Sequence, residues 1–148
     1  MAVKRWRVMR SVPDTGSGET LPDGILGLGC DLCAVARLER ELAAPERGFL
    51  TSVFLPSEMT RAKAYPDPAR RLAAVFAAKE AVIKSLARAG GRGTFWQEIE
   101  IGDDGRGGPV ATLRGRLLAL AQELGVRRIL VSSAHDRDHA TACAIVTR

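Results

Sequence analysis

Apolar and polar residues follow two different periods along the chain, and each period predicts a type of element. The run from Gly24 to Leu32 is apolar and rich in glycine, which indicates a short buried strand. Residues 34–43 carry apolar side chains at helical spacing and end before Pro45, so they predict a helix. Residues 97–101 alternate, and a glycine-rich turn leads back through residues 109–113, which predicts a β-hairpin.

The strongest helical signal lies in the middle of the chain. Asp67 is a favoured N-cap residue, and Pro68 after it occupies the first helical position, where proline is well tolerated. Helical periodicity then continues to Gly90 and Gly91, a typical helix end. The remaining expected elements are a short apolar piece over 49–54, a short helix with Ser57 as its N-cap, a helix over 115–124 closed by Gly125, and strands over 127–134 and 140–146.

The order of these elements predicts an α+β fold. Strands that follow one another in the sequence turn straight back, so we expect a mainly antiparallel sheet packed with one long and several short helices. Residues 1–23 are rich in Arg, Gly, Ser, Pro and Asp and have no period, so they are expected to form a flexible N-terminal extension. Residues 24–148 are then expected to form a single domain.

Composition narrows the class of protein. No apolar run approaches the ~18 residues that a membrane span needs, so no membrane association is expected. Three cysteines without a secretory signal favour the cytoplasm. The net charge of +5 suggests an acidic partner, which leaves a phosphate-rich ligand, an acidic protein or nucleic acid open. Aromatic residues make up only 5% of the chain, which weakens the nucleic-acid interpretation, and no nucleic acid is expected as a partner.

The long helix contains an anomaly. Lys79 falls near the middle of its apolar stripe, where an ammonium without a partner is costly. Glu80 and Lys84 lie on a flank rich in alanine. One interpretation is a surface Glu80–Lys84 ion pair with Lys79 reaching outward. The other is a site in which both lysines bind phosphates and Glu80 holds a metal ion with Asp31, because Mg²⁺ usually takes one or two protein carboxylates.

Six segments of the sequence resemble one enzyme family. GLGCDL, FLPSEM, LAAVFAAKEAVIKSLARAGG, FWQEIEI, GGP and VSSAHDRDHATACAIV occur in this order, and together they span roughly residues 24–146. In this arrangement the chain is similar to holo-[acyl-carrier-protein] synthases, which are small 4'-phosphopantetheinyl transferases. The resemblance implies transfer of the 4'-phosphopantetheine arm of coenzyme A to a serine of an apo acyl carrier protein, with Mg²⁺ bound and 3',5'-ADP released.

The resemblance also implies roles for individual residues. It makes Asp31, Glu80 and Lys84 the catalytic residues, and the two carboxylates among them the metal ligands. The residues expected to contact coenzyme A are Lys79, Lys84, Arg88, Gly90, Gly91 and His135. The residues expected to face the acidic carrier protein are Arg37, Arg40 and Arg47. Family members of this length are usually homotrimers with active sites at the subunit interfaces, and they serve fatty-acid or polyketide biosynthesis.

Two alternatives compete with this hypothesis. Cys30 and Cys33 form a C-x-x-C spacing, which with His135 and His139 gives a nominal zinc or redox set, but about a hundred residues separate the two pairs. A strand also sends residues 30 and 33 to opposite faces. The second alternative is a relative that binds carrier proteins without catalysis.

Departures from the family's usual patterns motivate the second alternative. They are Val75 in place of an arginine, the segment 87–91, and Ala134 in place of a hydroxyl residue.

Overall fold

The computed structural model describes residues 24–86 and 95–148. Its strands are β1 (Ile25–Ala34), β2 (Ile99–Asp103), β3 (Pro109–Leu113), β4 (Arg128–His135) and β5 (His139–Thr147). Its α-helices are α1 (Val35–Ala43), α2 (Phe49–Val53), α3 (Pro56–Lys63), α4 (Pro68–Leu86) and α5 (Gly115–Glu123), and its short 3₁₀ helices are η1 (Pro45–Arg47) and η3 (Trp96–Glu98). The predicted extension over residues 1–23 lies outside the described residues.

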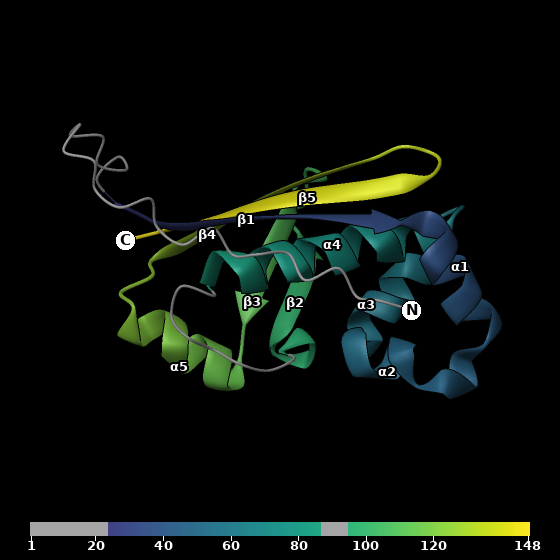
Figure 1. Ribbon diagram of the computed structural model, residues 1–148, viewed down its shortest axis with the longest axis horizontal. Coiled ribbons are helices and arrows are strands. Elements are labelled where there is room, and N and C mark those ends of the chain that lie inside the picture. Colours follow the sequence, from purple (N-terminus) through teal and green to yellow (C-terminus); the bar gives the residue numbers. More distant parts are fainter. Residues whose placement is uncertain (1–23, 87–94) are drawn as a thin grey trace, which may run out of the picture.

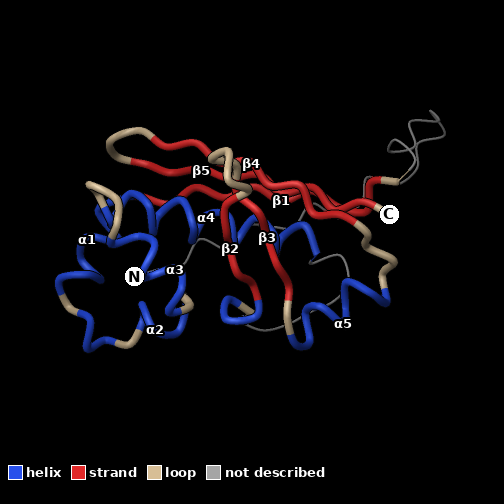
Figure 2. Tube along the Cα trace, turned by 180° about the vertical axis from the view of Figure 1, so that it is seen from behind, coloured by secondary structure: helices blue, strands red, loops and turns tan. Residues whose placement is uncertain are grey.

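The long helix α4 lies between a sheet and a hairpin. Strands β1, β5 and β4 form a three-stranded antiparallel sheet in that order, and β2 pairs with β3 in a separate antiparallel hairpin. The sheet covers one side of α4, and helices α1 to α3 gather at one end of the molecule, with α5 at the other (Figure 1). Seen from behind, the hairpin passes across α4 (Figure 2). The predicted α+β fold with antiparallel strands is confirmed.

The face of the sheet that meets α4 is built from small residues. A β-carbon added at Gly29 of β1 would lie 2.1 Å from the carbonyl oxygen of Ala81, and one added at Gly27 would lie 2.1 Å from that of Ser85. Glycine in a strand commonly marks such a close approach of another backbone. The neighbouring β5 presents three fully buried alanines to the same helix, Ala140, Ala142 and Ala144. The alanine-rich flank of α4 therefore packs against the sheet.

Lys79 of α4 has a buried partner. Its Nζ lies 2.7 Å from Oε2 of Glu58 in α3, and both side chains are 0% exposed. The same ammonium donates to the carbonyls of Val53 at 2.7 Å and Trp96 at 2.9 Å. Burial lowers the pKa of Lys79, and the hydrogen bond from Lys79 to Glu58 opposes that shift. The prediction that Lys79 contacts coenzyme A is wrong, because the core encloses its ammonium among protein partners.

Several local predictions are confirmed and others are corrected. Asp67 caps α4, since its Oδ1 accepts the backbone N–H of Arg70 at 2.9 Å. Ser57 is not an N-cap: Leu55 holds that position, and the Ser57 hydroxyl donates to Glu100 instead. The apolar piece over 49–54 is a helix over its first five residues, and the strand predicted from residue 97 begins at Ile99 after a 3₁₀ turn.

Substitution of Gly29 by alanine should destabilise the fold strongly. The added methyl group would meet the backbone of α4, which cannot rotate away, so we expect a loss in the free energy of unfolding of about 3 kcal/mol or more. Gly102→Ala in β2 is the matched control, because a β-carbon there has its nearest neighbour at 3.9 Å. Urea unfolding measures both variants, and equal losses would contradict the proposed close contact.

Candidate active site

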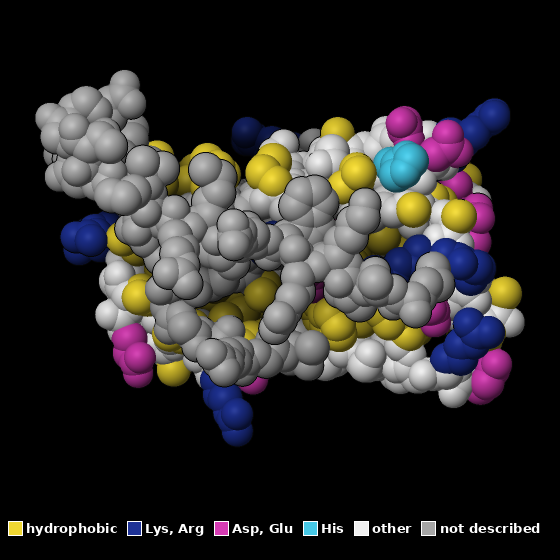
Figure 3. Space-filling model, viewed as in Figure 1, with side chains coloured by type: hydrophobic (Ala, Val, Ile, Leu, Met, Phe, Trp, Pro, Cys, Tyr) yellow, Lys and Arg dark blue, Asp and Glu magenta, His cyan; other side chains and the backbone are white. Residues whose placement is uncertain are grey.

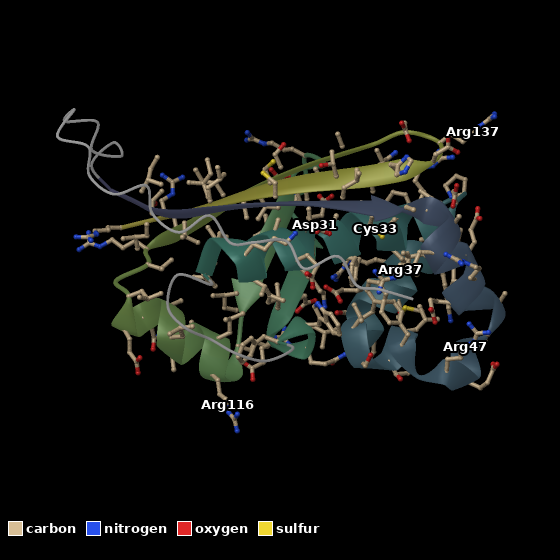
Figure 4. The ribbon with its side chains drawn as sticks, viewed as in Figure 1. Asp31, Cys33, Arg37, Arg47, Arg116 and Arg137 are labelled. Carbon is tan, nitrogen blue, oxygen red and sulfur yellow. The ribbon has the colours of Figure 1, made fainter. Side chains whose placement is uncertain are left out.

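Asp31 and Lys84 form an ion pair between the sheet and the long helix. Asp31 lies on the face of β1 that meets α4, between strand and helix in Figure 4. Lys84 Nζ lies 2.6 Å from Asp31 Oδ1 and 3.0 Å from the carbonyl oxygen of Cys30. The pair forms because Gly29 lets α4 approach: a β-carbon at Gly29 would lie 2.8 Å from Cβ of Lys84. Both charged groups remain partly open to solvent.

Glu80 precedes Lys84 by one helical turn but has a different partner. Its Oε1 accepts a hydrogen bond from Nε1 of Trp96 at 2.5 Å. The surface Glu80–Lys84 pair of the first interpretation is therefore not formed, because Lys84 contacts the sheet and Glu80 contacts η3. Lys79 strengthens this arrangement, because its ammonium holds the main-chain carbonyl of the same Trp96. Two consecutive residues of α4 thus fix both the backbone and the indole of Trp96.

The two predicted carboxylates converge around Cys33. This thiol is 3% exposed, and burial is the main reason why its pKa rises to about 11. The charges of Asp31 and Glu80 raise the pKa of Cys33 further, while Arg37 lowers it. All three charged groups therefore act on one buried point where β1 leads into α1. Asp31 and Lys84 are in direct contact, and Glu80 lies one helical turn before Lys84, so the three predicted residues lie near one another. Their roles at a metal and diphosphate site stay a prediction.

Arg37 is held at the edge of this site by aromatic rings. Its guanidinium carbon lies 4.9 Å from the centre of the Phe49 ring and 4.7 Å from that of Phe76. Arg40 and Arg47 are also exposed, on α1 and η1. Figure 3 shows Lys and Arg side chains gathered at this end of the molecule, and Figure 4 places Arg37 and Arg47 there. Exposed arginines, with acidic side chains among them, therefore lie at this end of the molecule.

The other predicted contact residues are placed differently. His135 ends β4 and is exposed. It lies opposite Ala140 of β5, and Ala140 lies opposite Cys33 of β1. His135 is therefore on the same face of the sheet as Asp31. Arg88, Gly90 and Gly91 lie outside the described residues.

The zinc or redox set is not assembled in the described part of the chain. Cys30 is exposed on one face of β1 and Cys33 is buried on the other, as the strand period predicts. Within residues 24–86 and 95–148, no group of three or more His, Cys, Asp or Glu residues could hold a metal ion. No helix of this part is long and apolar enough to cross a membrane.

Trp96 is the site residue that sequence reasoning missed. The segment FWQEIEI alternates and resembles a family pattern, and neither signal assigns a role to the tryptophan. The available signal was an indole directly before a strand that borders the predicted site, since a buried indole N–H needs an acceptor.

The fold and the site together define a class of enzyme. A sequence model of the 4'-phosphopantetheinyl transferase superfamily matches residues 27–144, which run from within β1 to within β5. The chain belongs to this superfamily.

Individual relatives agree with this assignment. The chain is 43% identical to a holo-[acyl-carrier-protein] synthase of Moorella thermoacetica, over 82% of this chain and 94% of the relative. It is 38% identical to a holo-[acyl-carrier-protein] synthase of Trichlorobacter lovleyi, over 82% and 97% of the two chains. The structure of the Helicobacter pylori holo-[acyl-carrier-protein] synthase in complex with coenzyme A is similar with a TM-score of 0.67 and 26% identity, covering 80% of this chain and 98% of that one.

Proposed function

We propose that this chain is a holo-[acyl-carrier-protein] synthase. It transfers the 4'-phosphopantetheine group of coenzyme A to a serine of an apo acyl carrier protein and releases 3',5'-ADP. The observation that carries the proposal is the convergence of Asp31, Glu80 and Lys84 in a chain of this superfamily. The activity belongs in the cytoplasm, where it supplies carriers of fatty-acid or polyketide biosynthesis.

Asp31 and Glu80 fit as ligands of a magnesium ion. Hard divalent cations prefer carboxylate oxygens, and Mg²⁺ usually takes one or two of them and completes its shell with phosphate oxygens and water. Among the described residues, Lys84 contacts one oxygen of Asp31 and Trp96 contacts one oxygen of Glu80. The contacts thus orient both carboxylates and engage only one oxygen of each. When bound, the metal ion would neutralise negative charge on the diphosphate of coenzyme A.

Lys84 is suited to stabilise the negative charge of the leaving group, 3',5'-ADP. The serine oxygen forms a bond to the phosphorus that carries the pantetheine arm, and the bond from that phosphorus to the bridging oxygen breaks. Negative charge then gathers on the departing 3',5'-ADP, so a cation near the bridging oxygen stabilises the transition state. Lys84 is partly exposed and reaches over the sheet edge of the site, which supports this role.

The residues around the carboxylates are suited to bind the two substrates, the carrier protein and coenzyme A. Arg37, Arg40 and Arg47 present positive charge beside the carboxylates, and a carrier protein rich in acidic residues would be steered to this surface. The stacking of Arg37 on two rings reduces its freedom before binding, which lowers the entropic cost of a contact. His135, with Arg88, Gly90 and Gly91, is proposed to contact coenzyme A.

An exposed apolar sheet face supports assembly into a homotrimer. The face of the three-stranded sheet that points away from α4 carries Leu28, Leu32 and Leu130, which are 63%, 65% and 47% exposed. Contiguous apolar surface of this kind marks an interaction site more often than a solvent face. We propose that three copies bury these faces against one another, and that each active site is completed at a subunit interface.

The transferase activity can be tested directly. Apo acyl carrier protein incubated with this chain, coenzyme A and Mg²⁺ should gain the mass of one phosphopantetheine arm, as intact-mass spectrometry measures. Asp31→Ala and Glu80→Gln should each reduce the rate by at least about 100-fold, because each removes a carboxylate from the proposed metal site. Circular dichroism should show that both variants remain folded.

Two outcomes would count against this proposal. If several carriers bind but none gains mass, the non-catalytic alternative is favoured. If both variants retain the wild-type rate, the site is wrongly assigned.

Trp96 should position Glu80 for the metal ion. Trp96→Phe keeps an aromatic ring in the cluster with Phe49 and Phe76 but removes the N–H that contacts Glu80. We expect Mg²⁺ binding, measured by calorimetry with coenzyme A present, to weaken by about 10-fold. Gln97→Ala is the control, because this neighbour donates to the main chain of residues 51 and 54 instead. Equal Mg²⁺ affinity in the wild type and in Trp96→Phe would contradict the proposal that Trp96 positions Glu80.

The proposed trimer can be tested by placing charged residues on the sheet face that points away from α4. Sedimentation should give the wild-type protein three times the 15.9 kDa mass of the chain. Leu28→Lys combined with Leu130→Lys should give monomers, because two buried unpaired charges per subunit oppose contact. Leu118→Lys on α5 is the control, since this leucine is 41% exposed but lies away from the sheet face. A monomeric wild type, or a double variant that stays trimeric, would reject the proposed interface.

A further inference from the structure

The two carboxylates of the proposed metal site are held by partners of different charge. Asp31 Oδ1 lies 2.6 Å from the ammonium of Lys84, which makes a charge-assisted contact. Glu80 Oε1 accepts the N–H of the Trp96 indole, which is neutral. A cation of the chain therefore balances the charge of Asp31, whereas the contact to the indole leaves the charge of Glu80 unbalanced.

The ammonium of Lys84 lowers the affinity of these carboxylates for a dication. A positive charge beside a carboxylate repels a second cation, whichever carboxylate oxygen that cation approaches. The Asp31 side chain is 15% exposed, so water screens this repulsion only in part. Asp31, Glu80 and Lys84 together carry a formal charge of −1, and the two carboxylates alone carry −2. The site attracts a dication more strongly once the ammonium has left it.

Lys84 is free to change partners in a way that Lys79 is not. Lys84 lies in the last turn of α4, and its side chain is 39% exposed. Its second contact among the described residues is to a neutral group, the carbonyl oxygen of Cys30 at 3.0 Å. Lys79, by contrast, is 0% exposed and enclosed by its partners. A diphosphate carries a negative charge on each phosphoryl group, so it competes with the single charge of Asp31 for the Lys84 ammonium.

We propose that Lys84 makes metal binding conditional on the diphosphate of coenzyme A. While Lys84 is paired with Asp31, it keeps the metal affinity of the site low. When the diphosphate is bound, Lys84 exchanges Asp31 for the phosphoryl oxygens, and Asp31 becomes available as a metal ligand. This inference rests on the proposed function, and it adds a coupling between the two ligands. By linkage, a bound metal ion must raise the affinity for coenzyme A by the same factor.

A second role for Lys84 would be to orient Asp31 for the metal ion. A contact that only orients a ligand carboxylate raises metal affinity, so its removal weakens metal binding. Exchange and orientation thus predict changes of opposite sign when the ammonium is removed. The geometry favours exchange, because the Trp96 indole shows that a neutral donor is enough to orient a carboxylate of this site, whereas Asp31 faces a full positive charge.

The test compares metal binding with and without the diphosphate. Mn²⁺ is the probe, because carboxylates bind it as they bind Mg²⁺ and electron paramagnetic resonance measures its free concentration. Lys84→Met should bind Mn²⁺ alone about 10-fold more tightly than the wild type does. Coenzyme A should then strengthen Mn²⁺ binding by a factor about 10-fold smaller in Lys84→Met than in the wild type. Lys84→Gln should behave like Lys84→Met, because it keeps an N–H donor and loses the charge.

Three controls separate the exchange from other effects. Lys63→Met removes the same charge from an exposed lysine of α3, which pairs with neither carboxylate of the site in the described part of the chain, so Mn²⁺ binding should not change. Pantetheine lacks the diphosphate and should not strengthen Mn²⁺ binding to the wild type. Asp31→Ala should abolish Mn²⁺ binding in the wild-type and Lys84→Met backgrounds alike.

The outcomes distinguish this inference from the proposed function. If Lys84→Met binds Mn²⁺ alone no more tightly than the wild type, the conditional role of Lys84 is wrong. The transferase assignment then stands as long as Asp31→Ala still removes metal binding and transfer. If Mn²⁺ binding survives Asp31→Ala, the metal site itself is wrongly assigned, and the inference fails together with the proposed site.

Discussion

The close approach of α4 to β1 is the constraint on which the site depends. Gly27 and Gly29 remove the side chains that would hold helix and strand apart, and the helix backbone occupies the space that they leave. Because Cβ of Lys84 lies directly over Gly29, the lysine can reach Asp31 on the next inward-facing position of the strand. The active-site ion pair is thus a consequence of packing between two backbones.

A second buried interaction fixes the opposite side of α4. Lys79 and Glu58 are fully enclosed, and Glu58 also accepts backbone N–H groups from Leu55 and Ile101 at 2.8 Å each. A buried ion pair is weak evidence for net stability, but its loss on one side leaves an uncompensated charge in the core. Its specific effect here is geometric. It ties α3, β2 and η3 to the helix, and so brings the Trp96 indole to Glu80.

Local signals in the sequence predicted most elements and placed three candidate site residues near one another. The capping of α4 by Asp67, the hairpin and the convergence of Asp31, Glu80 and Lys84 all follow from periodicity, turn chemistry or family resemblance. The partner of Lys79 could not be predicted, because Glu58 is brought to it by tertiary packing across 21 positions.

The cross-strand partner of Cys30 could not be predicted for the same reason. The strand period separates Cys30 from Cys33, but only strand register, which no local pattern encodes, pairs Cys30 with Cys143.

Strand β1 carries two unrelated tasks on its two faces. Its inward positions hold the glycines, Asp31 and Cys33, and its outward positions hold Leu28, Cys30 and Leu32. Since a strand alternates with a period of two, a one-residue shift of β1 against β5 and α4 would exchange both sets at once. The leucines would then meet α4 and the carboxylate would face solvent. In evolutionary terms β1 can accept substitutions at outward positions one by one, but length changes within it should be eliminated in functional descendants.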